Sequence, residues 1–168
     1  HTWDHANLAK LSMEKVNMQY DKTADLVKKM VGYDITLLRP PYGAISEKMR
    51  KKLKHPMVLW NTDTLDWKSK NTKAIMKEIK KNVKDGGIIL MHDIHEPSVK
   101  AALRLIPDLI AQGYKLVTVS EMAEAKNVTL QNACYVDFWP STLSNGDVPG
   151  YQGGSDAAAS ADGTDGTS

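Results

Sequence analysis

The stretch Asp85-Gly86-Gly87-Ile88-Ile89-Leu90-Met91-His92-Asp93 decides the fold class. Its Asp-Gly-Gly segment turns the chain, and the four apolar residues at 88–91 form a run of the kind that parallel sheets bury on both faces. The sequence becomes polar again at His92. The stretch therefore predicts a buried strand that delivers a histidine to the edge of an α/β sheet.

Helices and strands alternate on both sides of this stretch. Apolar residues recur at three- and four-residue steps over residues 12–30, as an amphipathic helix requires, and Gly32 is the natural end of that helix. Ser46 is the predicted N-cap of a short basic helix, and Pro97 begins a helix that ends near Gly113. The alternation at short spacings predicts a parallel α/β sheet or barrel. The other predicted elements are a helix through Ile75, Ile79 and Val83 and strands at residues 35–38, 57–60 and 115–119.

The size and composition fit one globular domain. Of the 168 residues, 42% are apolar and 25% are charged, which is typical of globular proteins. No run approaches the roughly 18 apolar residues of a membrane helix, so no membrane span is expected. The net charge is +2, and the lysines are scattered along predicted helical faces, so nucleic-acid binding is not expected. The single cysteine, Cys134, excludes an internal disulfide framework.

The alternation of helix and strand ends near Lys126. Residues 127–140 include Phe138 and Trp139, and we expect this segment to dock on the domain as an extension. Residues 141–168 consist mainly of Gly, Ser, Ala, Asp and Thr. Such a segment cannot bury enough apolar surface to offset the entropy lost on ordering, so a disordered linker is predicted.

Reactive or rigid residues follow three of the apolar runs. In parallel α/β folds the carboxyl ends of the strands meet on one rim, where functional sites are built. The order of the three groups therefore predicts a shared site. The groups are Arg39-Pro40-Pro41-Tyr42, Asp63-Thr64-Leu65-Asp66-Trp67 and His92-Asp93-Ile94-His95.

Two histidines, His1 and His5, have a spacing that suits metal binding. On a helix or a tight turn, both imidazoles could reach one cation at about 2.0 to 2.1 Å. A catalytic zinc usually has three protein ligands and a water molecule, so an oxygen ligand is expected from elsewhere. Two surface histidines without a metal are the alternative.

The remaining groups also have both a structural and a functional interpretation. Arg39 either holds a loop through an ion pair or orients a carboxylate. Asp63 and Asp66 most often form turns or caps in such a loop. His92 is either a structural histidine or a general acid that a neighbouring Asp keeps protonated.

Taken together, the motifs resemble those of the NodB-like polysaccharide deacetylases, which are carbohydrate esterase family four. The resemblance rests on His1-xxx-His5, Arg39-Pro-Pro-Tyr42, Asp63-xxx-Trp67 and Leu90-x-His92-Asp93, in that order. It implies a distorted (β/α)7–8 barrel and metal-dependent hydrolysis of N-acetyl groups on a polymeric amino sugar. The wording Asp-Thr-Leu-Asp-Trp-Lys is most similar to the bacterial peptidoglycan N-acetylglucosamine deacetylases, and chitin is a second possible polymer.

The resemblance implies a metal site and an oxyanion site in the first half of the chain. His1 and His5 would hold a divalent metal, usually zinc, together with an Asp. Arg39 would orient the catalytic base. The backbone N–H of Tyr42 would help to stabilise the oxyanion.

The resemblance implies an acid and an acetyl pocket in the second half of the chain. His92 would be the general acid, tuned by Asp63. Trp67 and Leu90 would shape the pocket for the acetyl methyl group.

One essential motif of the family is absent from the 168 residues. In the family, Thr-Phe-Asp-Asp-Gly-Pro supplies the base and the metal-binding Asp and normally lies upstream of the first histidine. Residues 1–126 are therefore interpreted as the C-terminal part of a catalytic domain, and the N-terminal part is an expected partner. The chain alone is expected to be inactive. A cell-wall substrate implies an extracellular or cell-surface location.

Two other functions are compatible with the same motifs. The first is an acetylxylan O-deacetylase, since the same groups cleave esters and an alkoxide needs less help from an acid. The second is an inactive relative that binds carbohydrate.

Overall fold

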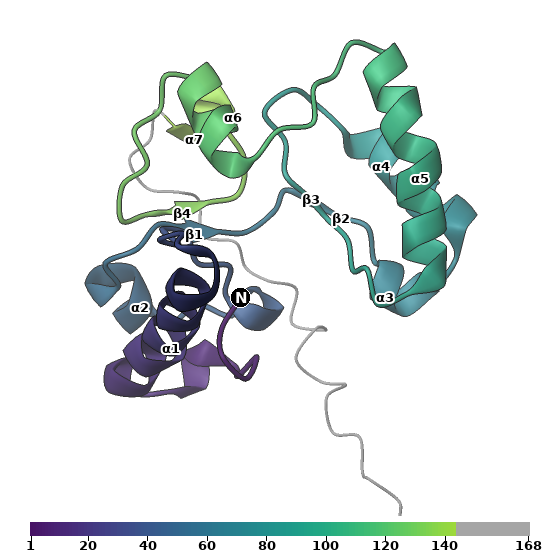
Figure 1. The fold of residues 1–168 in the computed structure, drawn as a ribbon. Helices are drawn as coiled ribbons and strands as arrows, with labels where there is room; N and C mark the ends of the chain where they lie inside the picture. The colour runs from purple at the N-terminus through teal and green to yellow at the C-terminus, as the bar shows by residue number, and fades with distance from the viewer. Residues whose placement is uncertain (144–168) are drawn as a thin grey trace, which may run out of the picture. The chain divides into compact units, whose positions relative to one another are not determined.

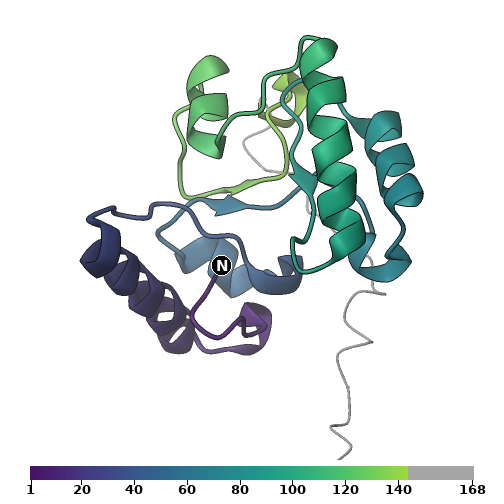
Figure 2. The same ribbon diagram turned by 45° about the vertical axis from the view of Figure 1, so that its right-hand side comes forward.

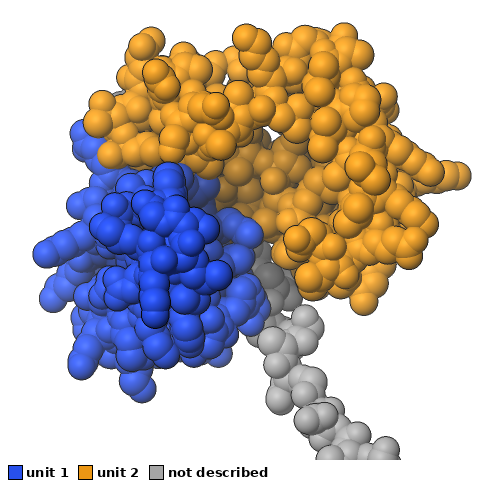
Figure 3. Space-filling model, viewed as in Figure 1, with its two compact units in different colours: residues 1–58, 131–134, 149–168 blue, residues 59–130, 135–148 orange. Residues whose placement is uncertain are grey.

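The computed structural model describes residues 1–143, which form two compact units (Figures 1 and 3). Unit 1 contains residues 1–58 and 131–134. Unit 2 contains residues 59–130 and, as far as it is described, 135–143. The predicted linker, residues 141–168, lies outside the described part except for its first three residues. Among residues 1–143, no helix combines the length and apolarity that crossing a membrane requires.

The helices of unit 1 begin and end where local sequence signals predict. The side chain of Ser12 accepts the N–H of Lys15, and the side chain of Ser46 accepts the N–H of Met49. Gly32 ends the first helix in the left-handed conformation, at φ +71°, which costs glycine little. The elements are η1 (Leu8–Lys10), α1 (Met13–Val31), η2 (Pro41–Gly43), α2 (Glu47–Lys52) and β1 (Met57–Val58).

The predicted apolar face of α1 is buried only in its first half. Val16 and Tyr20 are buried there, and Gln19 lies buried between them. Val31, the last residue of the helix, is 70% exposed. The periodicity therefore predicted the helix correctly but overestimated the length of its contact.

The predicted strand at residues 35–38 is a single parallel bridge in the structure. Leu38 bridges to Met57, and the N–H of Val58 donates to the carbonyl of Leu38 over 2.8 Å. In turn, the N–H of Met57 donates to the carbonyl of Ala133 over 2.8 Å. Residues 35–38 therefore lead into the Arg39 loop and are joined to the neighbouring strand by a single β-bridge.

Unit 2 contains a short parallel sheet, as the sequence predicts. Thr62 pairs with Ile89 and Asp63 with Leu90. Leu90 is buried, whereas Ile89 is only partly buried, so the strand is less enclosed than predicted. The elements are β2 (Thr62–Asp63), α3 (Asp66–Ser69), α4 (Thr72–Asn82), β3 (Ile89–Leu90), α5 (Glu96–Ala111), α6 (Val119–Ala125) and α7 (Pro140–Leu143), with β4 (Cys134–Tyr135) at the boundary of the units.

Helices α4 and α5 lie side by side and contain the main core of unit 2 (Figures 1 and 2). Each helix contributes apolar residues spaced three or four positions apart to this core, as helix packing requires. This packing fixes the first turn of α5 next to the loop that precedes α4. The buried core residues are Ile75, Ile79, Ala101, Leu105 and Leu109.

The prediction of a strand at residues 115–119 is wrong. No regular element covers residues 114–118, and α6 begins at Val119 with Thr118 as its N-cap. Leu116 and Val117 are 53% and 43% exposed. An apolar run becomes a strand only where a neighbouring strand pairs with its backbone, and within residues 1–143 β3 pairs with β2 alone. Closure of the predicted barrel therefore stays a prediction.

Candidate active site

The loop between β2 and α3 places Asp66 inside unit 2. Leu65 adopts a left-handed backbone conformation, at φ +50°, which is uncommon for a residue with a side chain. The carboxylate of Asp63 stabilises this turn by accepting the N–H of Leu65 over 2.9 Å. The turn ends at α3, and the side chain of Asp66 is fully buried.

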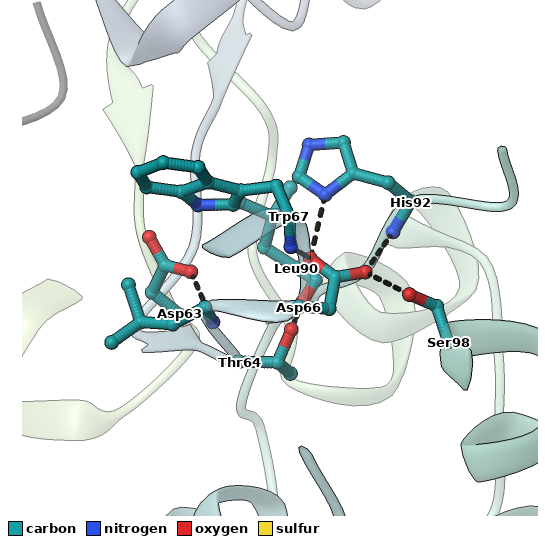
Figure 4. Close-up of polar contacts among 8 residues, drawn as sticks. Asp63, Thr64, Asp66, Trp67, Leu90, His92 and Ser98 are labelled. Atoms are coloured by element: carbon teal, nitrogen blue, oxygen red, sulfur yellow. Dashed lines mark hydrogen bonds and ion pairs between the residues drawn. The ribbon is translucent and has the colours of Figure 1, made fainter. Parts of the chain in front are cut away.

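The Asp66 carboxylate receives four hydrogen bonds (Figure 4). Its Oδ1 lies 2.8 Å from Nδ1 of His92 and accepts the N–H of Trp67 over 2.9 Å. Its Oδ2 accepts the backbone N–H of His92 and the hydroxyl of Ser98, both over 2.7 Å. Four charge-assisted bonds compensate for removing this carboxylate from water.

The hydrogen bonds keep the Asp66 carboxyl ionised. Burial by itself raises the pKa of this group, but hydrogen bonds from Ser98 and His92 and the attraction of the imidazole outweigh burial, so the pKa of Asp66 lies below its usual value. An ionised carboxylate only accepts hydrogen bonds, so Nδ1 of His92 carries a hydrogen. The other ring nitrogen, Nε2, points away from Asp66 (Figure 4).

The carboxylate that contacts His92 belongs to Asp66 and not to Asp63. The predicted pairing with Asp63 is wrong, because the Asp63 side chain is engaged by Leu65 and lies apart from the His92 ring (Figure 4). The Asp63 carboxylate accepts a backbone N–H within the turn, whereas the Asp66 carboxylate contacts the His92 ring.

The two predicted pocket residues of unit 2 lie beside this network. Leu90 is 7% exposed, and its carbonyl accepts the hydroxyl of Thr64 over 2.8 Å. Trp67 is partly buried and touches Asp66 through its backbone. The His92 side chain is 33% exposed, so its ring is accessible from solvent. Their roles toward an acetyl group stay predictions.

The structure brings His1 and His5 together on a bend, not on a helix. Their ring centroids lie 4.7 Å apart with an interplanar angle of 72°. His5 has φ +60°, and its ring also contacts that of Tyr42 edge-on, at 4.9 Å. Tyr42 has φ +60° as well. His5 and the residue that contacts its ring, Tyr42, thus both have a strained backbone, and such strain is typical of functional sites.

The two imidazoles fit a cation as two of its protein ligands. His1 Nδ1 lies 2.8 Å from the carbonyl of Arg39. A carbonyl only accepts, so Nδ1 carries the hydrogen and Nε2 keeps a free lone pair, the arrangement found in metal-ligating histidines. Among residues 1–143 there is no group of three or more His, Cys, Asp or Glu side chains that could hold a metal.

The Arg39 side chain lies partly buried in the loop that ends at Tyr42. Burial lowers its pKa, although a guanidinium remains charged at neutral pH. Within the described chain, no acidic side chain forms an ion pair with it. A carboxylate partner for Arg39 is therefore still required from elsewhere if the predicted role is correct.

Comparisons with known proteins identify the family. The family model for polysaccharide deacetylase matches residues 1–58. The peptidoglycan-N-acetylmuramic acid deacetylase PdaC of Bacillus subtilis (strain 168) is 42% identical over 126 residues, which cover 75% of this chain and 27% of PdaC. The solved structure of the T48 deacetylase with substrate is 37% identical, with a TM-score of 0.74, over 80% of this chain and 67% of that chain. This chain belongs to the polysaccharide deacetylase family.

A third protein similar to this chain has a structure with a metal bound. It is a family 4 acetyl xylan esterase from Clostridium thermocellum in complex with a cobalt ion, 25% identical, with a TM-score of 0.75 over 82% of this chain and 70% of that chain. The family predicted from the motifs is confirmed. The chain spans about a quarter of the length of the curated relatives it matches first.

Sequence reasoning missed two residues that position side chains of the candidate site. Ser98 on α5 donates to Asp66. Gln19 on α1 holds the histidine bend, because its backbone carbonyl accepts the N–H of Trp3 and its side-chain Oε1 accepts the N–H of Asp4, each over 3.2 Å. A polar residue on the apolar face of α1 was the available signal for Gln19. Ser98 has no comparable signal beyond its place in a first helical turn.

Proposed function

We propose that the protein containing this chain hydrolyses N-acetyl groups on a polymeric amino sugar in a metal-dependent reaction, with peptidoglycan as the first candidate substrate and a chitin-like polymer as the second. Family membership and the 42% identity to PdaC support the substrate class. The observation that carries the proposal is the ionised Asp66 beneath His92, with Nδ1 occupied and Nε2 accessible.

His1 and His5 would hold the cation, with zinc as the first candidate. The hydrogen bond from His1 Nδ1 to the Arg39 carbonyl supports this assignment, since it leaves Nε2 as the ligand atom. A divalent cation in such a site polarises a carbonyl oxygen and makes water a stronger acid. We assign the third ligand, an Asp, to a segment outside residues 1–168.

His92 would complete the reaction as the general acid. Addition of water to the acetyl carbonyl gives a tetrahedral adduct, and its C–N bond breaks only if the nitrogen is protonated. Nε2 of His92 supplies that proton, so that a free amine and acetate result. The Asp66 carboxylate stabilises the imidazolium before the transfer and fixes the ring so that Nε2 is the donating atom.

The other predicted site residues would position the substrate and the base. Arg39 would orient a base carboxylate contributed from outside the chain, and the backbone N–H of Tyr42 would stabilise the oxyanion. Trp67 and Leu90 would enclose the acetyl methyl group. We do not assign Asp63 a chemical role beyond its turn, because its carboxylate is engaged by Leu65.

The missing N-terminal part of the domain would supply the Asp pair and complete the barrel. Two observations support this. The buried hydroxyl of Thr2, between the two histidines, has no hydrogen-bond partner within residues 1–143. In addition, the apolar residues Leu116 and Val117 are exposed on a segment without regular secondary structure. Residues 1–126 would then be the C-terminal part of the catalytic domain.

Residues 127–140 would dock on the domain and lead into a linker. Phe138 is buried, and its N–H donates to the carbonyl of Gly86 over 2.8 Å, which supports the docking extension. The linker and an extracellular or cell-surface location are proposals from composition and from the substrate.

Acetate release tests the proposal. The protein is prepared with its upstream segment and zinc, and is incubated with peptidoglycan, chitooligosaccharides and acetylxylan; the 168-residue chain alone serves as the reference. We expect acetate from the amino-sugar polymers and none from the chain alone. His92→Ala is expected to lower turnover by about 10² or more, with its zinc content unchanged. Full activity of this variant would remove the histidine from the reaction.

The acetylxylan esterase is the second candidate, supported by the similarity to the Clostridium thermocellum enzyme. Preferential acetate release from acetylxylan would favour it. Glycan binding at equilibrium without release from any polymer would instead indicate an inactive carbohydrate-binding relative.

A further inference from the structure

The Asp66 carboxylate is held by donors from three parts of unit 2: α3, the segment after β3, and α5. Three of its four donors come from Trp67 and from His92 itself. The fourth is the hydroxyl of Ser98 on α5, 2.7 Å from Oδ2. Each carboxylate oxygen therefore has two donors, and Ser98 supplies the only side-chain hydroxyl among them.

Ser98 is placed by the first turn of α5. It is the third residue of that helix, after Pro97, and it is 1% exposed. Its N–H donates to the carbonyl of His95 over 2.9 Å. The hydroxyl of Thr72, the first residue of α4, donates to the carbonyl of Pro97 over 3.1 Å. The serine is thus held in a buried position against the carboxylate.

We propose that Ser98 is a positioning residue for the general acid: its hydroxyl fixes the plane of the Asp66 carboxylate so that Oδ1 faces Nδ1 of His92. Without the Ser98 hydroxyl, Oδ2 of Asp66 keeps the backbone N–H of His92 but has one lone pair unsatisfied, and the carboxylate gains freedom to rotate about its Cβ–Cγ bond. The His92 ring then loses the contact that sets its angle. The inference rests on the proposed function, since it concerns the acid of that reaction.

The kinetic test compares three variants of the protein that carries its upstream segment and zinc. Ser98→Ala is expected to lower kcat about 10-fold while KM changes less than about 2-fold, because the acid acts only after the substrate has bound. Ser98→Thr keeps the hydroxyl and is expected to stay within about 3-fold of the parent. Thr72→Val removes a hydroxyl that holds the same helical turn without touching Asp66, and is expected to retain kcat.

Two kinetic outcomes would overturn the proposal. If Ser98→Ala retains the parent kcat, the hydroxyl does not position the acid. If Thr72→Val lowers kcat as much as Ser98→Ala does, the effect comes from the placement of α5 and not from the hydroxyl on Asp66.

A spectroscopic test decides the proposal even if no polymer is hydrolysed. In ¹⁵N-labelled 168-residue chain, the hydrogen on Nδ1 of His92 should give a protected downfield proton resonance. We expect this resonance in the parent, in Ser98→Thr and in Thr72→Val, and its broadening or loss in Ser98→Ala. An unchanged resonance in Ser98→Ala, in a variant whose circular dichroism shows the same helicity as the parent, would show that the Ser98 hydroxyl does not position the Asp66 carboxylate.

Discussion

His92 in unit 2 and His5 in unit 1 are held by different kinds of contact. His92 has a charged hydrogen-bond acceptor beneath its ring, and that acceptor is buried and itself held by four hydrogen bonds. His5 has two aromatic neighbours, His1 and Tyr42, in edge contacts, and both His1 and His5 are exposed. Hydrogen bonds to a buried charge fix the orientation of a histidine ring, whereas ring contacts at the surface fix that orientation only weakly.

The difference suggests that His92 is pre-organised by the protein, whereas the orientation of His5 would be completed by the proposed cation. The Asp66–His92 pair is complete within unit 2, so its geometry should survive in the chain as it stands. In the proposed metal site, the His1–His5 pair would provide two ligand atoms and would depend on a cation and a third ligand for the rest of its order.

His5→Ala should have the largest effect. Losing one of two imidazole ligands should weaken zinc binding by more than the roughly 10- to 100-fold that surrounding residues contribute, and should lower acetate release by about 10³ or more, since the cation supplies several kcal/mol of stabilisation. Zinc content after dialysis and acetate release measure the two effects. His95→Ala, on a histidine outside both pairs, should leave both values unchanged. Equal zinc content in the two variants would contradict the assignment.

Asp66→Asn should destabilise unit 2 by about 3 kcal/mol at pH 7, because it removes a buried carboxylate and leaves donors that now bond to it without an acceptor. The folded-state pKa of Asp66 is lowered, so its contribution is fully present above the unfolded value of about 3.9 and disappears as the pH falls through the folded value. The difference between the parent and the variant should therefore shrink in acid. Urea unfolding at pH 7 and at steps down to pH 2 measures it.

Asp63→Asn is the matched control for Asp66, since both carboxylates lie in the same loop. It keeps an oxygen for the N–H of Leu65 and should cost less than about 1 kcal/mol at pH 7. A loss as large as that of Asp66→Asn would restore Asp63 as the main partner of the site.

Gln19→Ala should weaken zinc binding less than His5→Ala does. The variant loses the acceptor that holds the N–H of Asp4, so the histidine bend loosens while both imidazoles remain. Zinc affinity should fall about 10-fold, as measured by competition with a chelator. Asn17→Ala, an exposed amide on the same helix, should change the affinity little. Equal losses in the two variants would point to α1 as a whole.

Local signals in the sequence predicted the local parts of the structure. Ser12 and Ser46 cap helices because their hydroxyls need only the backbone three residues ahead. Likewise, the apolar run before His92 forms β3 in a parallel pair, as predicted. Each of these features depends on a few neighbouring residues or on one strong pattern. The place of His92 directly after the buried strand was therefore predictable as well.

Features that depend on distant or unusual backbone were not predictable in the same way. Residues 115–119 have the composition of a strand, but a strand also needs a partner that their own sequence does not specify. Asp66 contacts His92 after Leu65 adopts a left-handed backbone conformation, and a leucine does not predict that conformation. Ser98 meets Asp66 through the packing of α4 and α5, which no short motif encodes.

The four hydrogen bonds on Asp66 also limit what this carboxylate can do. A carboxylate offers about four lone-pair positions, and here the two protein donors on each oxygen take them up. No electron pair is left over for a cation, for solvent or for a substrate hydroxyl. Asp66 is therefore an anion that acts on a substrate only through His92, and the oxygen ligand of the proposed metal site would have to come from another residue.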